Sequence, residues 1–185
     1  ITEYNIIKFS NEVRQENGLN PLFYNSDLTQ AARNKANYIF ESQTFAHNIT
    51  DKKFSNWIKE TDYKYSFAGE NLAMDFFTAE GVTEAWLESP SHKSNILSPD
   101  FQDIGVAVVD GELNGEYTTI IVQIFATPLI TPTTAPITNN EPLLKDNPEW
   151  VLNHSSQDSF LENSTGFKVL SLSSFSLNSI NKLYN

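Results

Sequence analysis

The stretch SPSHKSNILSPDFQDIGVAV, residues 89–108, decides the fold, because it joins a histidine-containing segment to an alternating apolar run. That run, DIGVAVVD at residues 103–110, and the later run EYTTIIVQIFA at 116–126 are rich in Val, Ile and Thr, which favour β-strands. Asn114-Gly115 between them is a strong hairpin-turn signal. The sequence therefore predicts two paired antiparallel strands, with a histidine just ahead of them.

Helices are predicted before these strands, because apolar residues recur three or four positions apart in that part of the chain. Polar N-cap residues and glycine or proline stops mark their ends. A turn at Ala68-Gly69 is predicted between the third helix and the fourth. The predicted helices are a first one that ends at Asn17-Gly18, residues 28–45 after the caps Asn25, Ser26 and Asp27, a short one within residues 54–63, and residues 79–89 between Thr78 and Pro90.

The composition is that of a globular protein with an acidic surface. Twelve basic and 23 acidic residues give a formal net charge of -11 and a pI near 4.6. Such a surface repels a phosphate backbone, so we expect no nucleic-acid partner. The lack of cysteine excludes disulfide bonds, thiolate catalysis and cysteine-ligated zinc. No run approaches the ~18 apolar residues of a membrane-spanning helix, so no transmembrane segment is expected.

Composition also divides the chain into three segments. Residues 1–126 contain the predicted helices and strands and form the predicted domain. Residues 127–142 are rich in threonine and proline, which is typical of an extended linker. Residues 143–185 are rich in serine and asparagine without a clear period, which predicts a tail that is partly ordered at best.

Two histidines and one glutamate are the candidate functional residues. His47, Glu70 and His92 each lie at the edge of a predicted element, where side chains can converge on one site. Two imidazoles and a carboxylate can bind a divalent metal, and an imidazole beside a carboxylate can act as a general acid or base. The spacing leaves open the alternative that each histidine is a hydrogen-bonded structural residue in a loop.

Five other residues have structural interpretations. Asparagine side chains commonly cap turns, so Asn71 and Asn95 are predicted to do so. Gly69 and Gly105 are predicted at turn or bulge positions, where glycine is often required. Trp86 lies on the apolar stripe of the fourth predicted helix and is predicted to be a core residue.

The motifs of the chain, taken together, resemble the CAP superfamily, which comprises the cysteine-rich secretory proteins, antigen 5 and pathogenesis-related 1. The resemblance covers about residues 3–126 and is greatest to the cysteine-free branch that is common in secreted bacterial proteins. That branch has a Ser-Pro-x-His pattern, in which the glycine usual before the histidine is Ser91 here. The motifs, in order, are NEVRQENGLNPLFYNSDLTQAA, FAHN, FAGENLA, AWLESPSHKSNIL, and FQDIGVAV through VQIFA.

The resemblance implies an α+β fold, a three-layer α-β-α sandwich in which a small antiparallel sheet lies between helices. It also implies a central cleft lined by two histidines and two glutamates. Matched motif by motif, His47 of FAHN corresponds to the first histidine, Glu70 of GENLA to the first glutamate, and His92 of SPSH to the second histidine. On this basis His92 is expected to complete the cleft.

The second glutamate of the family is missing from this chain. In the disulfide-rich members it follows the helix tryptophan by three residues, and the residue three positions after Trp86 is Ser89. At about 100° per residue, Ser89 shares a helical stripe with Trp86, whereas Glu84 and Glu88 lie on the opposite side. The expected cleft therefore contains Ser89 and only three of the family's four ionisable groups.

Two functions follow from the resemblance. The preferred one is a monomeric binding module, secreted or at the cell envelope, whose cleft binds a lipid, an envelope component or a protein without turnover. A start at Ile rather than Met agrees with a processed product. No Gly-x-Ser-x-Gly nucleophile motif occurs, which also favours binding.

The alternative is a metal-assisted hydrolase of peptides or esters. In it, His47 and His92 would hold a divalent metal such as Zn²⁺, and Glu70 would be a third ligand or the general base. A further alternative is a structural spacer whose tail mediates assembly.

Overall fold

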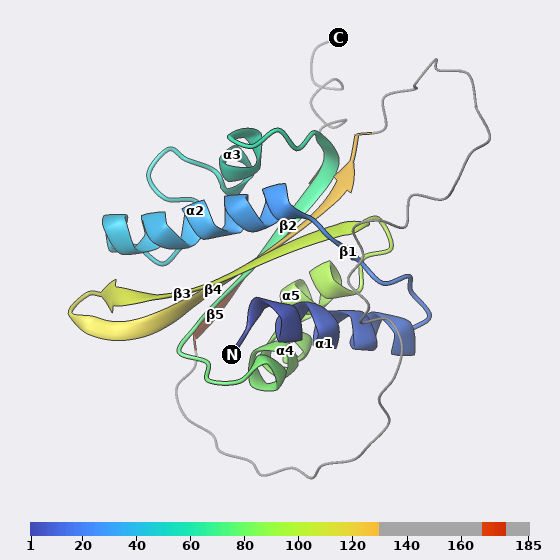
Figure 1. The fold of residues 1–185 in the computed structure, drawn as a ribbon, viewed down its shortest axis with the longest axis horizontal. Coiled ribbons are helices and arrows are strands. Elements are labelled where there is room, and N and C mark those ends of the chain that lie inside the picture. Colours follow the sequence, from blue (N-terminus) through green and yellow to red (C-terminus); the bar gives the residue numbers. More distant parts are fainter. Residues whose placement is uncertain (130–167, 177–185) are drawn as a thin grey trace. The chain divides into compact units, whose positions relative to one another are not determined.

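A computed structural model describes residues 1–129 and the backbone of residues 168–176 (Figure 1). The rest of the predicted linker and tail lies outside these residues, so the three-segment division stays a prediction. The elements in chain order are α1 (Glu3–Glu16), β1 (Phe23–Tyr24), α2 (Ser26–Ser42), α3 (Phe54–Lys59), β2 (Tyr65–Met74), α4 (Ala79–Glu88), α5 (Pro90–Ile96), β3 (Asp103–Leu113), β4 (Glu116–Pro128) and β5 (Lys168–Ser176).

The strands form one five-stranded sheet in the order β1-β3-β4-β2-β5. The central pair, β3 and β4, is the predicted hairpin, with Leu113 opposite Glu116 across a two-residue turn. Asn114 and Gly115 in that turn have φ of 53° and 84°, as a type I′ turn requires. The predicted antiparallel pair is thus confirmed. The short strand β1, which is parallel to β3, and the strands β2 and β5 were not predicted.

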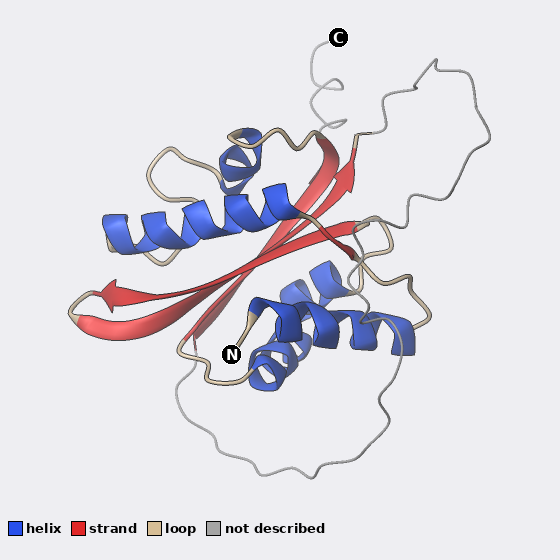
Figure 2. Cartoon of the chain, in the orientation of Figure 1, coloured by secondary structure: helices blue, strands red, loops and turns tan. Residues whose placement is uncertain are grey.

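Helices cover both faces of the sheet, with α2 and α3 on one face and α1, α4 and α5 on the other (Figure 2). Each face has its own apolar core, because successive side chains of a strand point to opposite sides. In β4, Val122 and Ile124 pack against α2 and α3, while Ile121 and Phe125 pack beneath the other three helices. The α-β-α sandwich implied by the resemblance is therefore confirmed.

The predicted N-caps lie where the helices begin. The side chain of Asn25 accepts hydrogen bonds from the backbone N–H groups of Asp27 and Leu28, and that of Thr78 accepts one from Gly81. These bonds satisfy amide groups that have no partner within the first turn of a helix. The starts of the second and fourth predicted helices are confirmed.

Pro90 differs from its prediction, because it begins a helix as well as ending one. It is at the first turn of α5, where its missing N–H costs nothing and its fixed φ suits a helix. Ser89, in an extended conformation, separates α4 from α5. His92, expected at the edge of a predicted element, therefore lies within a helix that was not predicted.

Two glycines are needed for close packing rather than for turns. Gly69 lies inside β2, so the predicted turn at Ala68-Gly69 is wrong, although the pairing with β5 shifts register at this point. Gly105 lies in a regularly paired part of β3, so neither a turn nor a bulge explains it. A Cβ on Gly105 would lie 2.3 Å from the backbone at Leu28 and Thr29, because the start of α2 rests directly on β3.

We expect Gly105→Ala to lower the free energy of unfolding by about 3 kcal/mol or more, because the backbone of α2 would have to move away from the sheet. Urea unfolding measures this loss. Gly111→Ala in the same strand is the matched control, since its Cβ would meet the Phe40 ring at 2.9 Å, and a side chain can turn aside. Equal losses in the two variants would contradict this explanation of Gly105.

Candidate functional site

His47 and Glu70, predicted from separate motifs, form a direct pair. His47 lies in the loop between α2 and α3, and Glu70 lies in the middle of β2 on the face covered by those helices. The imidazole Nδ1 is 2.7 Å from the carboxylate Oε1. The Glu70 side chain is fully buried, while that of His47 keeps 12% of its surface exposed. The pair thus has its carboxylate inside the fold and its imidazole at the surface.

Each member of the pair has one buried polar atom that is not hydrogen-bonded. His47 Nε2 and Glu70 Oε2 are both inaccessible, and neither has a hydrogen-bond partner among the described residues. Buried polar atoms are nearly always paired, because leaving one unpaired costs about 1–3 kcal/mol. Two such atoms on adjacent side chains can form hydrogen bonds with a molecule outside the chain, either water or a ligand.

Lys35, which the sequence analysis did not select, holds the loop that carries His47. Its side chain is fully buried in α2, and Nζ donates hydrogen bonds to the carbonyl oxygens of Ala46 and His47 at 2.8 and 2.5 Å. Burial lowers the pKa of Lys35, and the negative charge of Glu70 partly offsets that effect. The lysine therefore both positions His47 and supplies positive charge near the buried carboxylate.

Helical spacing contained the signal that could have identified Lys35. Residues 31, 32, 36 and 39 form the apolar stripe of α2, and position 35 falls within it. A lysine on a buried stripe needs hydrogen-bond acceptors or a counter-charge, since an isolated buried ammonium group is costly. Which groups those are depends on the loop and on β2, far away in sequence.

His92 is not part of the His47–Glu70 pair. It is buried on α5, which covers the opposite face of the sheet from α2, and its backbone carbonyl accepts a hydrogen bond from Asn71 Nδ2 at 3.4 Å. Within residues 1–129 and 168–176, no three His, Asp or Glu side chains are grouped so that they could hold a metal ion. The cleft and the metal implied by the resemblance therefore stay predictions.

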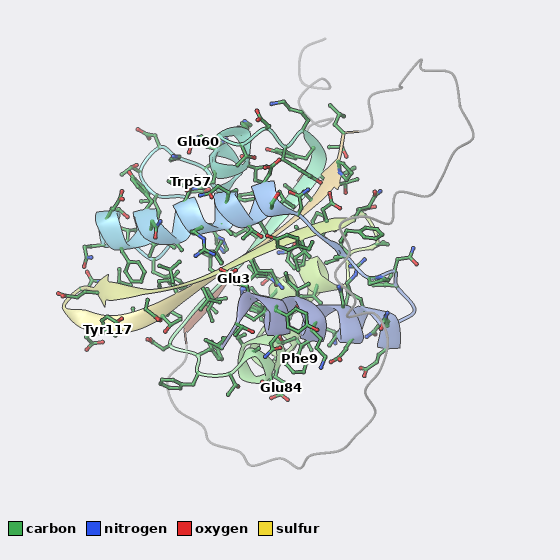
Figure 3. The ribbon with its side chains drawn as sticks, viewed as in Figure 1. Glu3, Phe9, Trp57, Glu60, Glu84 and Tyr117 are labelled. Atoms are coloured by element: carbon green, nitrogen blue, oxygen red, sulfur yellow. The ribbon has the colours of Figure 1, made fainter. Side chains whose placement is uncertain are left out.

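Among residues 1–129, no glutamate near Trp86 takes the place of the missing second one. Ser89 is partly exposed between α4 and α5, and its hydroxyl lies 3.4 Å from that of Ser91. Glu84 and Glu88 are exposed, and Figure 3 shows Glu84 on the outer side of α4, pointing away from the sheet. These positions agree with the helical geometry expected from the sequence.

Asn71 and Asn95 are structural, but they do not cap turns as predicted. Both are buried, and Asn95 Nδ2 donates to Asn71 Oδ1 at 2.9 Å and to the carbonyl oxygen of Glu70 at 3.2 Å. Asn71 Nδ2 donates in turn to Gln123 Oε1, and Gln123 Nε2 donates to Ser10 Oγ. These four side chains, the buried amide network, connect α5, β2, β4 and α1. The sequence predicted structural roles for Asn71 and Asn95, but not these partners.

Comparison with known proteins identifies the family. Residues 7–125 match the sequence model of the cysteine-rich secretory protein family, CAP. The chain belongs to the CAP family. It is 35% identical over 109 residues to the uncharacterized protein YkwD of Bacillus subtilis, a match that covers 58% of this chain and 42% of YkwD. The resemblance inferred from the motifs is thus confirmed.

Two solved CAP-like structures are similar in fold. An outer surface protein of Borrelia burgdorferi has a TM-score of 0.59 and 25% identity, over 67% of this chain and 90% of that one. An extracellular protein of Bacillus anthracis that contains an SCP domain has a TM-score of 0.61 and 21% identity, over 68% and 40% of the two chains. The match spans less than half of the length of YkwD.

None of the helices in the described part of this CAP chain is long and apolar enough to span a bilayer. That finding concerns residues 1–129 and 168–176.

We expect Lys35→Met to be less stable than the parent chain at pH 7 by about 1–3 kcal/mol, because two buried carbonyl oxygens lose their donor. The difference should grow as pH rises towards the ~10.4 of an unfolded lysine. The folded pKa is lowered, so the unfolded chain binds more protons in that window and the parent gains stability with pH, while the variant does not.

Urea unfolding between neutral pH and pH 10 measures this difference. The matched control is Lys59→Met, since Lys59 is exposed at the end of α3. Identical pH slopes for the parent chain and Lys35→Met would contradict a lowered pKa of Lys35.

Proposed function

We propose that this CAP chain is a secreted protein that binds a ligand at the His47–Glu70 pair without chemical turnover. The observation that carries the proposal is the pair of adjacent buried atoms, His47 Nε2 and Glu70 Oε2, that lack hydrogen-bond partners among the described residues. A ligand that bonds to both would remove the cost of leaving them unpaired. Binding needs nothing more from the site, whereas a reaction would also need a nucleophile or an activated water.

The names of the similar structures support an extracellular location. One is an outer surface protein and the other is described as extracellular. The acidic composition, with a net charge of -11, suits a protein that stays soluble and does not adsorb to anionic membranes. The location and the ligand are linked, because an extracellular domain would bind a ligand that is present outside the cell.

The chemistry of the pair favours a ligand that donates hydrogen bonds. The tautomer of His47 that donates from Nδ1 to the carboxylate Oε1 leaves a lone pair on Nε2. Both unpaired buried atoms are then acceptors. Hydroxyl groups of a sugar or amide groups of a peptide supply the matching donors, which makes envelope saccharides and peptides better candidates than a purely apolar lipid.

A titration of the full chain with a soluble peptidoglycan disaccharide-tetrapeptide, followed by NMR of the His47 ring nitrogens, tests this. We expect these resonances to shift on binding and the affinity to fall about tenfold or more in Glu70→Gln, since an amide NH₂ would then face the ligand's donors. Glu84→Gln is the matched control, because Glu84 is exposed on the outer side of α4.

The same titration is repeated with phosphatidylcholine–cholesterol vesicles, which test whether the chain binds an apolar lipid instead. Equal binding by the parent chain and Glu70→Gln, or unchanged His47 resonances with both probes, would count against a ligand site at this pair.

A second candidate function is hydrolysis, which the unpaired Nε2 of His47 favours, because an imidazole oriented by a carboxylate can act as a general base towards water. A metal-assisted form fits less well. His47 and Glu70 offer donor atoms, but no third histidine or carboxylate completes a metal set among the described residues. Zinc sites in catalytic proteins usually have three protein ligands.

Assays on a peptide and on a p-nitrophenyl ester separate the two functions. We expect no hydrolysis above that of His47→Ala, and no stoichiometric Zn²⁺ binding by calorimetry that is lost in the His47→Ala, His92→Ala double variant. Activity abolished by both a chelator and His92→Ala would replace binding with the metal-assisted mechanism. Activity that survives the chelator but not His47→Ala would indicate hydrolysis without a metal.

A further inference from the structure

Strand β2 is covered on both edges, and the strand on its outer edge comes from far along the chain. β4 pairs with one edge, and β5 pairs antiparallel with the other from Phe67, opposite Ser176, to Met74, opposite Lys168 (Figure 1). In the strand order, β5 is the terminal strand beyond β2. Without β5, β2 would itself be the edge of the sheet.

An uncovered β2 would be an efficient acceptor for another strand. Its residues from Ala68 to Met74 are all buried, and it carries no proline and, apart from Glu70, no charge. An edge strand presents a row of unpaired N–H and C=O groups, and proteins usually protect such edges with charges, prolines or bulges. Apart from Glu70 and the irregularity at Gly69, β2 has none of this protection, so pairing with another strand would satisfy its backbone groups.

The outer edge of β2 is also the edge of the candidate site. Glu70 pairs with Leu172, and the register shift between the two strands lies directly beside it, at Gly69. β5 also contacts α5, the helix that carries His92. β5 therefore lies next to both the strand of Glu70 and the helix of His92, two residues that the family resemblance implies in the cleft.

We propose that the outer edge of β2 is an acceptor for an extended peptide, and that β5 is the chain's own occupant of it. The peptide adds to the sheet by backbone hydrogen bonds, as in other proteins that bind peptides by strand addition. Its chemistry is given by β5, KVLSLSSFS, in which apolar and serine residues mix and a single charge stands at the first position. That this peptide is also the ligand of the His47–Glu70 pair rests on the proposed function.

An occupant in the same chain competes strongly with a free peptide. Residues 130–167 join β4 to β5, and linked segments of this kind act at effective concentrations of about a millimolar when the link can span the sites. A free peptide with micromolar affinity for the open edge would therefore be largely excluded. β5 thus blocks the outer edge of β2 until β5 is displaced or removed. Displacement of β5 would therefore regulate peptide binding at this edge.

The test compares the full chain with a double variant, Ser171→Pro and Leu172→Pro. Adjacent N–H groups in a strand point in opposite directions, so one of the two prolines removes a bond to β2. The matched control is Asn178→Pro with Ser179→Pro, which places the same change beyond the end of β5. Hydrogen exchange of the β2 amides reports the pairing, and fluorescence anisotropy of a labelled KVLSLSSFS peptide reports binding.

We expect the double variant to lose protection at the β2 amides that point to β5, and to bind the peptide about tenfold or more tightly than the parent chain and the control do. Protection in β3, which pairs with β1 and β4, is the internal reference for folding. If β3 also loses protection, the milder pair Leu170→Gly and Leu172→Gly takes the place of the prolines.

The proposal that the outer edge of β2 accepts a peptide would be overturned by either of two results. One is unchanged hydrogen-exchange protection of the β2 amides in a folded double variant. The other is equal peptide binding by the parent chain, the double variant and the control. Adding Glu70→Gln to the double variant tests the link to the His47–Glu70 pair. Weaker peptide binding is expected, and unchanged binding would overturn that link alone. Because the readouts are β2 amides and a peptide, a negative result with the peptidoglycan fragment does not affect this test.

Discussion

The rest of the structure depends on the buried amide network of Ser10, Asn71, Asn95 and Gln123. Each of these side chains comes from a different element, and the hydrogen bonds among them join α1, β4, β2 and α5 inside an otherwise apolar core. In such surroundings a hydrogen bond is strong, and an unpaired amide is costly, so the network tolerates few alternative arrangements. It therefore sets the position of α5 against the sheet, and with it the position of His92.

One face of β2 contributes to the buried amide network, and the other contributes to the candidate site. Asn71 points to the network, while its neighbour Glu70 points to the other face and meets His47. Adjacent residues of a strand face opposite ways, so an error of one residue in register would disrupt the network and the pair together. Asn95 also donates to the backbone carbonyl of Glu70, so the network holds the strand where its carboxylate is needed.

The candidate site is held rigidly but left incomplete. Hydrogen bonds from Lys35 hold the loop that carries His47, and the sheet holds Glu70 in β2. One side-chain atom of His47 and one of Glu70 nevertheless lack a hydrogen-bond partner among the described residues. A rigid site with unsatisfied acceptors is suited to binding, because little ordering is needed when a ligand arrives. Its place near the outer edge of β2 also explains how a strand such as β5 could control access to it.

The sequence by itself determined the family, the first four helices, the central hairpin and the residues His47 and Glu70. Local signals suffice for these features, since the Asn25 and Thr78 caps and the Asn114-Gly115 turn each act within a few residues. Only the tertiary structure decided that His92 lies on a helix across the sheet, that Lys35 supports His47, and that β5 covers β2. These outcomes depend on contacts between segments far apart in sequence, for which neither periodicity nor spacing carries a signal.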